Sequence, residues 1–118
     1  MTDLHALDRL VAVMTVDAYD VDEQIMAFHA VFEDEAGLPV SATVVGVPVL
    51  VTDVGIRANG IELTAHCRRE EVGQEISLTD LVFPPDTQAA WVHAAYRRCL
   101  GLAPFPAAIP EAWQPDML

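Results

Sequence analysis

The side chains with the clearest chemical potential in this 118-residue chain are four carboxylates near its N-terminus. They fall within seven positions of one short stretch: Asp17, Asp20, Asp22 and Glu23. Calcium and magnesium are hard cations that prefer several oxygen ligands, chiefly carboxylates, carbonyls and water. The stretch lies between two predicted helices, where backbone carbonyls are also free. Helix capping and a solvated linker explain the same residues, and the spacing alone leaves all three interpretations open.

The spacing of these acids does not match the EF-hand calcium loop. Counting from Asp20 as position 1, the acid required at position 3 is present as Asp22. Position 6 is Ile25 instead of Gly, and position 12 is Val31 instead of Glu. A calcium site in this stretch would therefore be of another type, weak and partly exposed.

A second acidic cluster strengthens the charge bias of the N-terminal third. It consists of Glu33, Asp34 and Glu35. Residues 1–36 contain nine acids and one Arg, whereas residues 37–118 contain nine acids and five Arg. The net charge is −12, and the chain contains no Lys. A chain this acidic is repelled by nucleic-acid phosphates and by anionic membranes, so neither is an expected partner.

The common catalytic patterns are absent from the sequence. It has no glycine-rich phosphate loop, no Gly-x-Ser-x-Gly elbow and no His-Glu-x-x-His pair. We therefore expect a protein that is not an enzyme, and the alternative is a small enzyme with a site around His66 or His93. A metal site that combined these histidines with Cys67 and Cys99 would need a convergence that their spacing does not indicate.

Cysteine use and the apolar runs indicate the cellular compartment. Cys67 and Cys99 form neither a disulfide framework nor a zinc-binding spacing. The longest apolar runs are far shorter than the roughly 20 residues that span a bilayer. The acidic N-terminus lacks a signal-peptide pattern. We expect a cytoplasmic protein with reduced thiols.

Hydrophobic periodicity predicts three helices, over residues 3–14, 20–36 and 87–100. The second helix should begin with Asp20 as its cap and end at Gly37, which favours the left-handed backbone of a helix C-terminus. The third should begin after Asp86 or Thr87 and end at Gly101.

The period changes to two between the second and third helices, which predicts strands. Residues 40–51 are rich in Val, with a bend or break marked by Gly46 and Pro48. The dipeptide Asn59-Gly60 predicts a hairpin between residues 49–56 and 61–68. A further strand at residues 74–77 and a helical turn precede the last strand. These short strands predict a small SH3-like barrel, and a simple antiparallel meander is the alternative.

We therefore predict an α+β fold with two N-terminal helices, a small SH3-like antiparallel β-barrel, a C-terminal helix and an irregular tail. A single domain would cover residues 1–101, with helices in 1–36, the barrel in 37–85 and the third helix in 86–101. A chain of this length supports one modest hydrophobic core.

Residues 102–118 form a tail with four prolines, which favours an irregular conformation. Phe105 and Trp113 are expected to hold the tail against the domain or against a neighbouring subunit. This gives a second functional hypothesis, a metal-free interaction module that uses the barrel surface and the tail to hold a protein partner or a second copy.

Parts of the chain resemble a known family. The segment from Leu10 to Tyr19 and the segment from Leu38 to Ala42 resemble the opening of the small bacterial calcium-binding proteins first described in cyanobacteria. The most specific pieces are Val16-Asp17-Ala18-Tyr19 with Glu23, and Leu38-Pro39. The resemblance covers roughly residues 7–83, and Ala95-Tyr96-Arg97-Arg98 is similar to an extension of actinobacterial-type relatives. The turn reads Tyr19-Asp20 where the family has Tyr-Gly.

The resemblance implies an SH3-like barrel and calcium binding, as a low-affinity buffer or sensor. The expected calcium ligands are Asp17, Asp20, Asp22 and Glu23, with a second cluster of Glu33, Asp34 and Glu35. A helix cap already accounts for Asp20 and Glu23. Asp17 has no such structural role, so it is the strongest single candidate.

Overall fold

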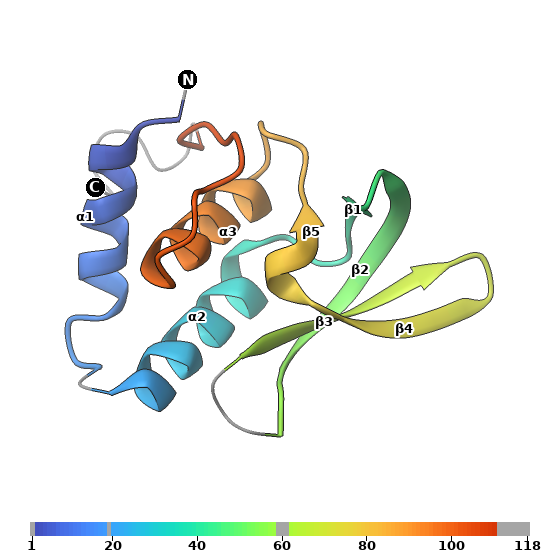
Figure 1. Cartoon of the computed structure of the whole chain (residues 1–118), viewed down its shortest axis with the longest axis horizontal. Coiled ribbons are helices and arrows are strands. Elements are labelled where there is room, and N and C mark those ends of the chain that lie inside the picture. Colours follow the sequence, from blue (N-terminus) through green and yellow to red (C-terminus); the bar gives the residue numbers. More distant parts are fainter. Residues whose placement is uncertain (1, 19, 59–61, 111–118) are drawn as a thin grey trace.

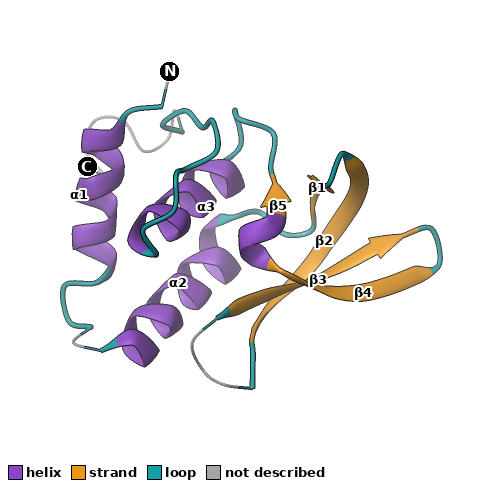
Figure 2. Cartoon of the chain, viewed as in Figure 1, coloured by secondary structure: helices purple, strands orange, loops and turns teal. Residues whose placement is uncertain are grey.

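The architecture is seen in a computed structural model that describes residues 2–18, 20–58 and 62–110. The helices are α1 (Leu4–Met14), α2 (Val21–Glu35) and α3 (Gln88–Cys99), and a 3₁₀ turn, η1, covers Leu78–Asp80. The strands are β1 (Val40–Val44), β2 (Val47–Ile56), β3 (Leu63–Arg69), β4 (Val72–Ser77) and β5 (Leu81–Val82). The three helices gather at one end of the molecule and the sheet forms the other (Figures 1 and 2). The predicted α+β class is confirmed.

The helix boundaries follow the local signals in the sequence. The Asp3 side chain caps α1 by accepting a hydrogen bond from the backbone N–H of Ala6, at 3.0 Å. The end of α2 is followed by Gly37, whose φ of +75° is the left-handed conformation that glycine adopts without strain. Thr87, not Asp86, caps α3. All three predicted helices are therefore present, with boundaries close to those expected.

The five strands form one antiparallel sheet in the order β4-β3-β2-β1-β5. A simple meander would leave β5 beside β4, but β5 pairs with β1, so the meander alternative is wrong. A register shift between Val51 and Asp53 bends β2, as β-bulges do. Among the described residues no pairing joins β4 to β5, so the sheet is open. A closed SH3-like barrel is therefore not confirmed.

The sequence predicted a turn or break on each side of β2, and the structure describes the first of them, between β1 and β2. The β1–β2 turn consists of Val45 and Gly46, both with positive φ, and Pro48 lies within β2. The predicted break after Gly46 is thus a two-residue hairpin. The predicted Asn59-Gly60 turn lies outside the described residues. The strands on either side of it, β2 and β3, pair as expected.

Helix α3 is buried around most of its circumference. The sequence pattern predicted one apolar side, but every residue from Ala89 to Tyr96 is buried. α1 and α2 both pack against α3, and η1 contacts it as well. Alanines at four of these eight positions allow the surrounding elements to approach closely. α3 is therefore the centre of the core.

Tyr96 connects this central helix to the sheet. Its hydroxyl oxygen accepts a hydrogen bond from the backbone N–H of Leu63, at 3.0 Å. Its ring meets the ring of Phe28 from α2 edge-on, with 5.6 Å between the ring centres. Burial raises the pKa of the Tyr96 hydroxyl above its ordinary value. One side chain thus joins α2, α3 and the start of β3.

His93 and the segment that follows α3 close the other side of the helix. His93 Nε2 lies 2.7 Å from the carbonyl oxygen of Leu78, and Phe105 stacks on the imidazole with 5.8 Å between ring centres. The guanidinium of Arg97 lies 4.0 Å above the Phe105 ring. Phe105 therefore packs on the domain of its own chain, which is one of the two arrangements expected for the tail.

The described ends of the chain also meet. The backbone N–H of Ala107 donates a hydrogen bond to the Thr2 hydroxyl, at 3.2 Å. Ala108 donates a backbone hydrogen bond to Pro85, at 3.0 Å. Trp113 lies outside the described residues. Residues 102–110 thus run back across the helical end of the molecule (Figure 1).

Two further expectations concern the thiols and the membrane. Cys67 and Cys99 are both free, and burial raises the pKa of each thiol, so both are poorly reactive. Across the described ranges, no helix combines the length and the apolar character that a membrane crossing requires.

Replacing Tyr96 by Phe tests the link between α3 and the sheet. Y96F leaves the buried N–H of Leu63 without a partner, which should lower the free energy of unfolding by about 1–3 kcal/mol. Urea denaturation measures this change. Ser41→Ala removes an exposed hydroxyl from β1 and should change stability by less than about 0.5 kcal/mol. Equal stability of Y96F and the parent protein would contradict the assigned role.

His93 should make stability depend on pH in a defined window. Burial lowers the pKa of His93 to about 4, from 6.5 in an unfolded chain. The unfolded state therefore binds a proton that the folded state rejects, and stability is lost as the pH falls from 6.5 toward 4. The expected loss from this group is about 3 kcal/mol.

Urea denaturation between pH 7 and pH 4 measures this loss, and His93→Gln should remove the His93 component of it. NMR titration of the ring gives the pKa directly and does not depend on the stability of the variant. A ring that titrates near 6.5 in the folded protein would overturn the prediction.

Candidate metal-binding surface

The first acidic stretch lies at the junction of α1 and α2. α1 ends at Thr15, whose backbone N–H and hydroxyl both donate to the carbonyl oxygen of Val11. A turn follows, closed by a 3.0 Å hydrogen bond from the Ala18 N–H to the Thr15 carbonyl. Asp17 stands in this turn and is exposed. No hydrogen bond or ion pair from the described residues engages its carboxylate, so Asp17 has no structural role there.

Asp20 has the structural role that the sequence predicted. Its Oδ1 accepts a hydrogen bond from the backbone N–H of Glu23, at 2.9 Å, and so caps α2. Asp22 and Glu23 lie in the first turn of the same helix and are exposed. Negative side chains are favourable here because the first turn carries unpaired N–H groups and the positive end of the helix dipole. A cation at this junction would share Asp20 with the helix cap.

Two of the four predicted ligands line one shallow hollow. Asp17 and Glu23 lie on its wall, in a space of about 310 Å³ between the end of α1 and the start of α2. Met14, Val16 and Met26 are the larger apolar residues beside them. Asp20 and Asp22 are not part of its lining. The structure therefore brings Asp17 and Glu23 together and leaves the other two outside the hollow.

The second predicted cluster occupies the opposite end of α2. Glu33, Asp34 and Glu35 are consecutive, and consecutive helical residues point in different directions. Glu23 and Glu33 are ten residues apart, so about 15 Å of helix separates the two clusters. One ion cannot bind both, and the second cluster does not present three converging carboxylates.

Glu33 also has a partner within the protein. Its Oε1 lies 2.9 Å from Nδ1 of His29, one helical turn earlier. The other ring nitrogen of His29 lies 2.9 Å from the carbonyl oxygen of Val54 in β2. Both contacts are hydrogen bonds when the ring carries two protons, because both partners are acceptors. Glu33 therefore helps to fix α2 on the sheet and is a weaker candidate ligand than Asp17.

A group of polar residues that was not predicted from the sequence lies on the outer face of the sheet. Asp53, His66 and Glu75 stand opposite one another on β2, β3 and β4. His66 Nδ1 lies 3.2 Å from Glu75 Oε1, and all three residues line a hollow of about 350 Å³. Only the strand register brings them together, and the sequence alone does not specify that register. The grouping leaves His66 accessible, whereas His93 is covered by aromatic rings.

None of these groups has the geometry of a complete metal site. Within residues 2–18, 20–58 and 62–110, no three His, Cys, Asp or Glu side chains converge as metal ligands would. The same holds for His66, His93, Cys67 and Cys99, which do not meet. An ion at Asp17 and Glu23 would therefore complete its shell with backbone carbonyls and water, as exposed calcium sites do.

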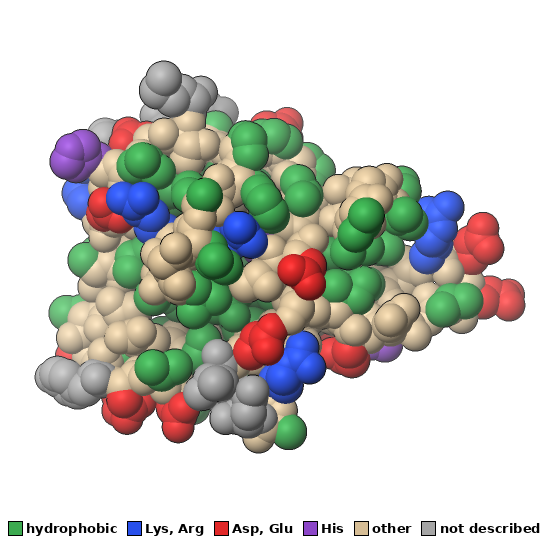
Figure 3. Space-filling model, in the orientation of Figure 1, with side chains coloured by type: hydrophobic (Ala, Val, Ile, Leu, Met, Phe, Trp, Pro, Cys, Tyr) green, Lys and Arg blue, Asp and Glu red, His purple; other side chains and the backbone are tan. Residues whose placement is uncertain are grey.

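Among the described residues, no Arg forms an ion pair with a carboxylate of the first cluster. Arg98 forms an ion pair with Asp8 of α1, with Nε 2.8 Å from Oδ1. The pair lowers the pKa of Asp8 and raises that of Arg98, mainly through this hydrogen bond. Arg97 donates to the carbonyl oxygens of Thr79 and Ala103. Figure 3 shows acidic side chains at the edge of the molecule where α1 meets α2.

These features define an α+β protein of three helices and an open five-stranded sheet, with an acidic surface where the first two helices meet. No family model matches the sequence, and a search of curated proteins finds no match either. Among solved structures, the crystal structure of CcbP from Anabaena has a TM-score of 0.70 and 15% sequence identity. The similarity covers 87% of this chain and 96% of that one.

CcbP is a cyanobacterial calcium-binding protein, so the structural neighbour is a protein of the kind that the sequence resembles. The predicted resemblance is confirmed in the fold. At this identity the similarity establishes a shared architecture, and it assigns no ligand to any residue of this chain.

Proposed function

We propose that this protein binds calcium at the α1–α2 junction and has no enzymatic activity. The observation that carries the proposal is the pairing of Asp17 with Glu23 in one exposed hollow, with the Asp17 carboxylate unused by the rest of the described structure. Two carboxylates and nearby carbonyls suit a hard cation that retains part of its water shell. The calcium-binding neighbour with the same fold supports the choice of ion.

The proposed role is that of a low-affinity buffer or sensor. Few protein ligands and an exposed site favour weak binding, of about 10⁻⁴ M or weaker. The net charge of −12 raises the local cation concentration and so favours capture from solution. Asp20 and Asp22 contribute to this field from the same helix end. The second cluster would add only a weak, separate association, since His29 already engages Glu33.

The metal-free interaction module remains the second hypothesis, in a changed form. Phe105 is engaged by His93 and Arg97, so it is not available as an anchor for a partner. The sheet also leaves apolar side chains exposed, among them Val45, Val47 and Val72.

Calcium titration of chelator-stripped protein tests the proposal. A ligand at 100 times its Kd stabilises the folded state by about 2.7 kcal/mol, which for a chain of this size raises the melting temperature by roughly 10 °C. Isothermal calorimetry measures the binding, differential scanning calorimetry measures the shift, and magnesium is the control ion. No heat and no shift at millimolar calcium would refute calcium binding.

Single substitutions locate the site. Asp17→Asn should weaken calcium binding about tenfold, since it removes a charged ligand, and should leave the melting temperature of the metal-free protein unchanged. Asp20→Asn keeps the helix cap, because Asn caps as well as Asp, and should have a smaller effect on calcium binding.

Asp86→Asn is the matched control, because it makes the same charge change at an exposed acid beside α3. Equal weakening by D17N and D86N would show that calcium responds only to the overall charge. Unchanged binding by D17N would exclude the α1–α2 junction as the site.

A further inference from the structure

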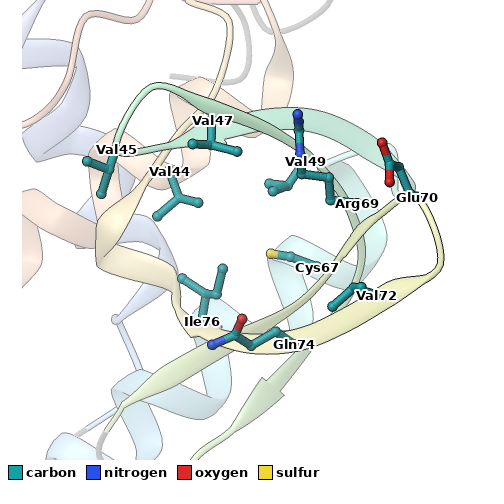
Figure 4. Close-up of a pocket in the computed structure, with 10 residues that line it drawn as sticks. All are labelled: Val44, Val45, Val47, Val49, Cys67, Arg69, Glu70, Val72, Gln74 and Ile76. Atoms are coloured by element: carbon teal, nitrogen blue, oxygen red, sulfur yellow. The ribbon is translucent and has the colours of Figure 1, made fainter.

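The open end of the sheet forms a hollow of about 550 Å³, called here the mouth. It lies between the β1–β2 turn and the β3–β4 turn, and its apolar lining includes Val44, Val47, Val49, Cys67, Val72 and Ile76 (Figure 4). Side chains alternate along a strand, so Val72 and Ile76 of β4 point into the mouth while Glu75 lies on the outer face with His66. The mouth is therefore aliphatic because of its strand register.

Several apolar residues at the mouth are exposed to solvent. Val45 is 95% exposed, Val72 67% and Val47 42%. Single exposed apolar side chains are common, but a contiguous apolar patch beside an apolar hollow is typical of an interaction site. The calcium proposal does not use this surface.

Val45 adds an independent observation, because its backbone is strained. Its φ is +49°, a left-handed conformation that two-residue hairpins normally assign to Asn, Asp or Gly. A β-branched residue is strongly disfavoured there. At 95% exposure the side chain gains almost no contact within its own chain in return. Strain of this kind is typical of functional sites. A contact of Val45 with another molecule would explain why valine occupies this position.

The rim of the mouth carries one positive and one negative side chain that do not pair. Arg69 Nη1 donates to the carbonyl oxygen of Pro48, at 2.9 Å, which holds the guanidinium at the edge of β2. Among the described residues, neither Arg69 nor Glu70 forms an ion pair. Each side chain can therefore still form an ion pair with an opposite charge on another molecule.

Such a rim is self-complementary. In a two-fold symmetric contact, the same patch of both molecules meets itself, and each charge faces the opposite charge of the other copy. An apolar knob beside an apolar hollow is self-complementary in the same way. The mouth offers both, Val45 as the knob and the space between Val49 and Val72 as the hollow.

The charge distribution of the whole molecule also favours a second copy at this end. The helices, which carry the acidic N-terminal third, lie at the opposite end of the long axis, and the molecule extends 40 Å along it (Figure 1). Two copies that meet through their mouths therefore keep their acidic ends far apart. The separation exceeds the Debye length of about 8 Å at physiological salt, so the repulsion between them is largely screened.

We propose that two copies of this chain associate through their mouths. Val45 of each copy enters the hollow of the other, and Arg69 of each faces Glu70 of the other. The contact is independent of calcium, since the α1–α2 junction lies at the far end of the molecule.

Analytical ultracentrifugation of the full chain tests the proposal, with chelator and then with calcium. A dimer should form as concentration rises, with the same dissociation constant in both conditions. A protein that stays monomeric at every concentration up to about 1 mM would overturn the proposal. A dimer that weak would have less than about 4 kcal/mol of binding free energy.

Val45→Asn separates the contact from folding. Asn adopts the left-handed conformation readily, so V45N should melt no lower than the parent protein. It should nevertheless weaken the dimer about tenfold or more, because it removes the apolar knob. Val13→Asn is the control, since Val13 is an exposed valine (62%) on α1, and it should leave dimerisation unchanged. Equal dimerisation of V45N and the parent would refute the contact.

A charge exchange tests the pairing across the two-fold axis. R69E and E70R each place like charges opposite one another and should weaken the dimer about tenfold. The double variant R69E/E70R restores opposite charges and should return the dissociation constant to within about threefold of the parent value. A double variant as weak as the singles would overturn the pairing. Native mass spectrometry that finds a monomer carrying an aliphatic molecule would instead assign the mouth to a small ligand.

Discussion

The structure depends above all on the burial of one helix. α3 is enclosed by α1, α2, η1 and the segment after residue 101, and its eight residues from Ala89 to Tyr96 are all buried. Burial of a polar group is costly unless it is hydrogen-bonded, and Tyr96 and His93 of this helix both have hydrogen-bond partners. Tyr96 accepts from the sheet and His93 binds η1, so both groups orient the helix while they avoid that cost. Within the described residues, Trp91 Nε1 is the buried side-chain atom without a partner.

This arrangement leaves the two ends of the molecule with different tasks. The helices surround α3 and present acids to solvent where α1 turns into α2. The sheet contributes its inner face to the core near the helices and opens into the mouth farther away (Figures 1 and 4). The buried centre therefore separates an acidic surface from an apolar hollow.

Much of this could be predicted from the sequence because the signals are local. Asp20, Gly37 and Thr87 act within a few residues of the helix ends that they define, and the short-range spacing also brought Asp17 near Glu23. The pairing of β5 with β1 and the complete burial of α3 depend on contacts between distant segments, and no local pattern specifies them. The same limit explains why the grouping of Asp53 with His66 and Glu75 was missed: it arises from strand register. The contact of Glu33 with His29, which makes Glu33 a weaker candidate ligand, did have a local signal. The two residues are four positions apart, and such residues are neighbours on a helix.

The hydrogen bond between Thr2 and Ala107 has a consequence for synthesis of the chain. The cover over α3 includes residues 102–110, which a ribosome makes after every helix and strand described here. Until those residues emerge, Phe105 cannot cover His93, and the first helix lacks its neighbour near Thr2. The domain therefore completes its fold only after these residues have emerged, and a nascent chain halted near residue 100 would expose one side of its most buried helix. Such a chain is a natural substrate for chaperones that bind exposed apolar segments.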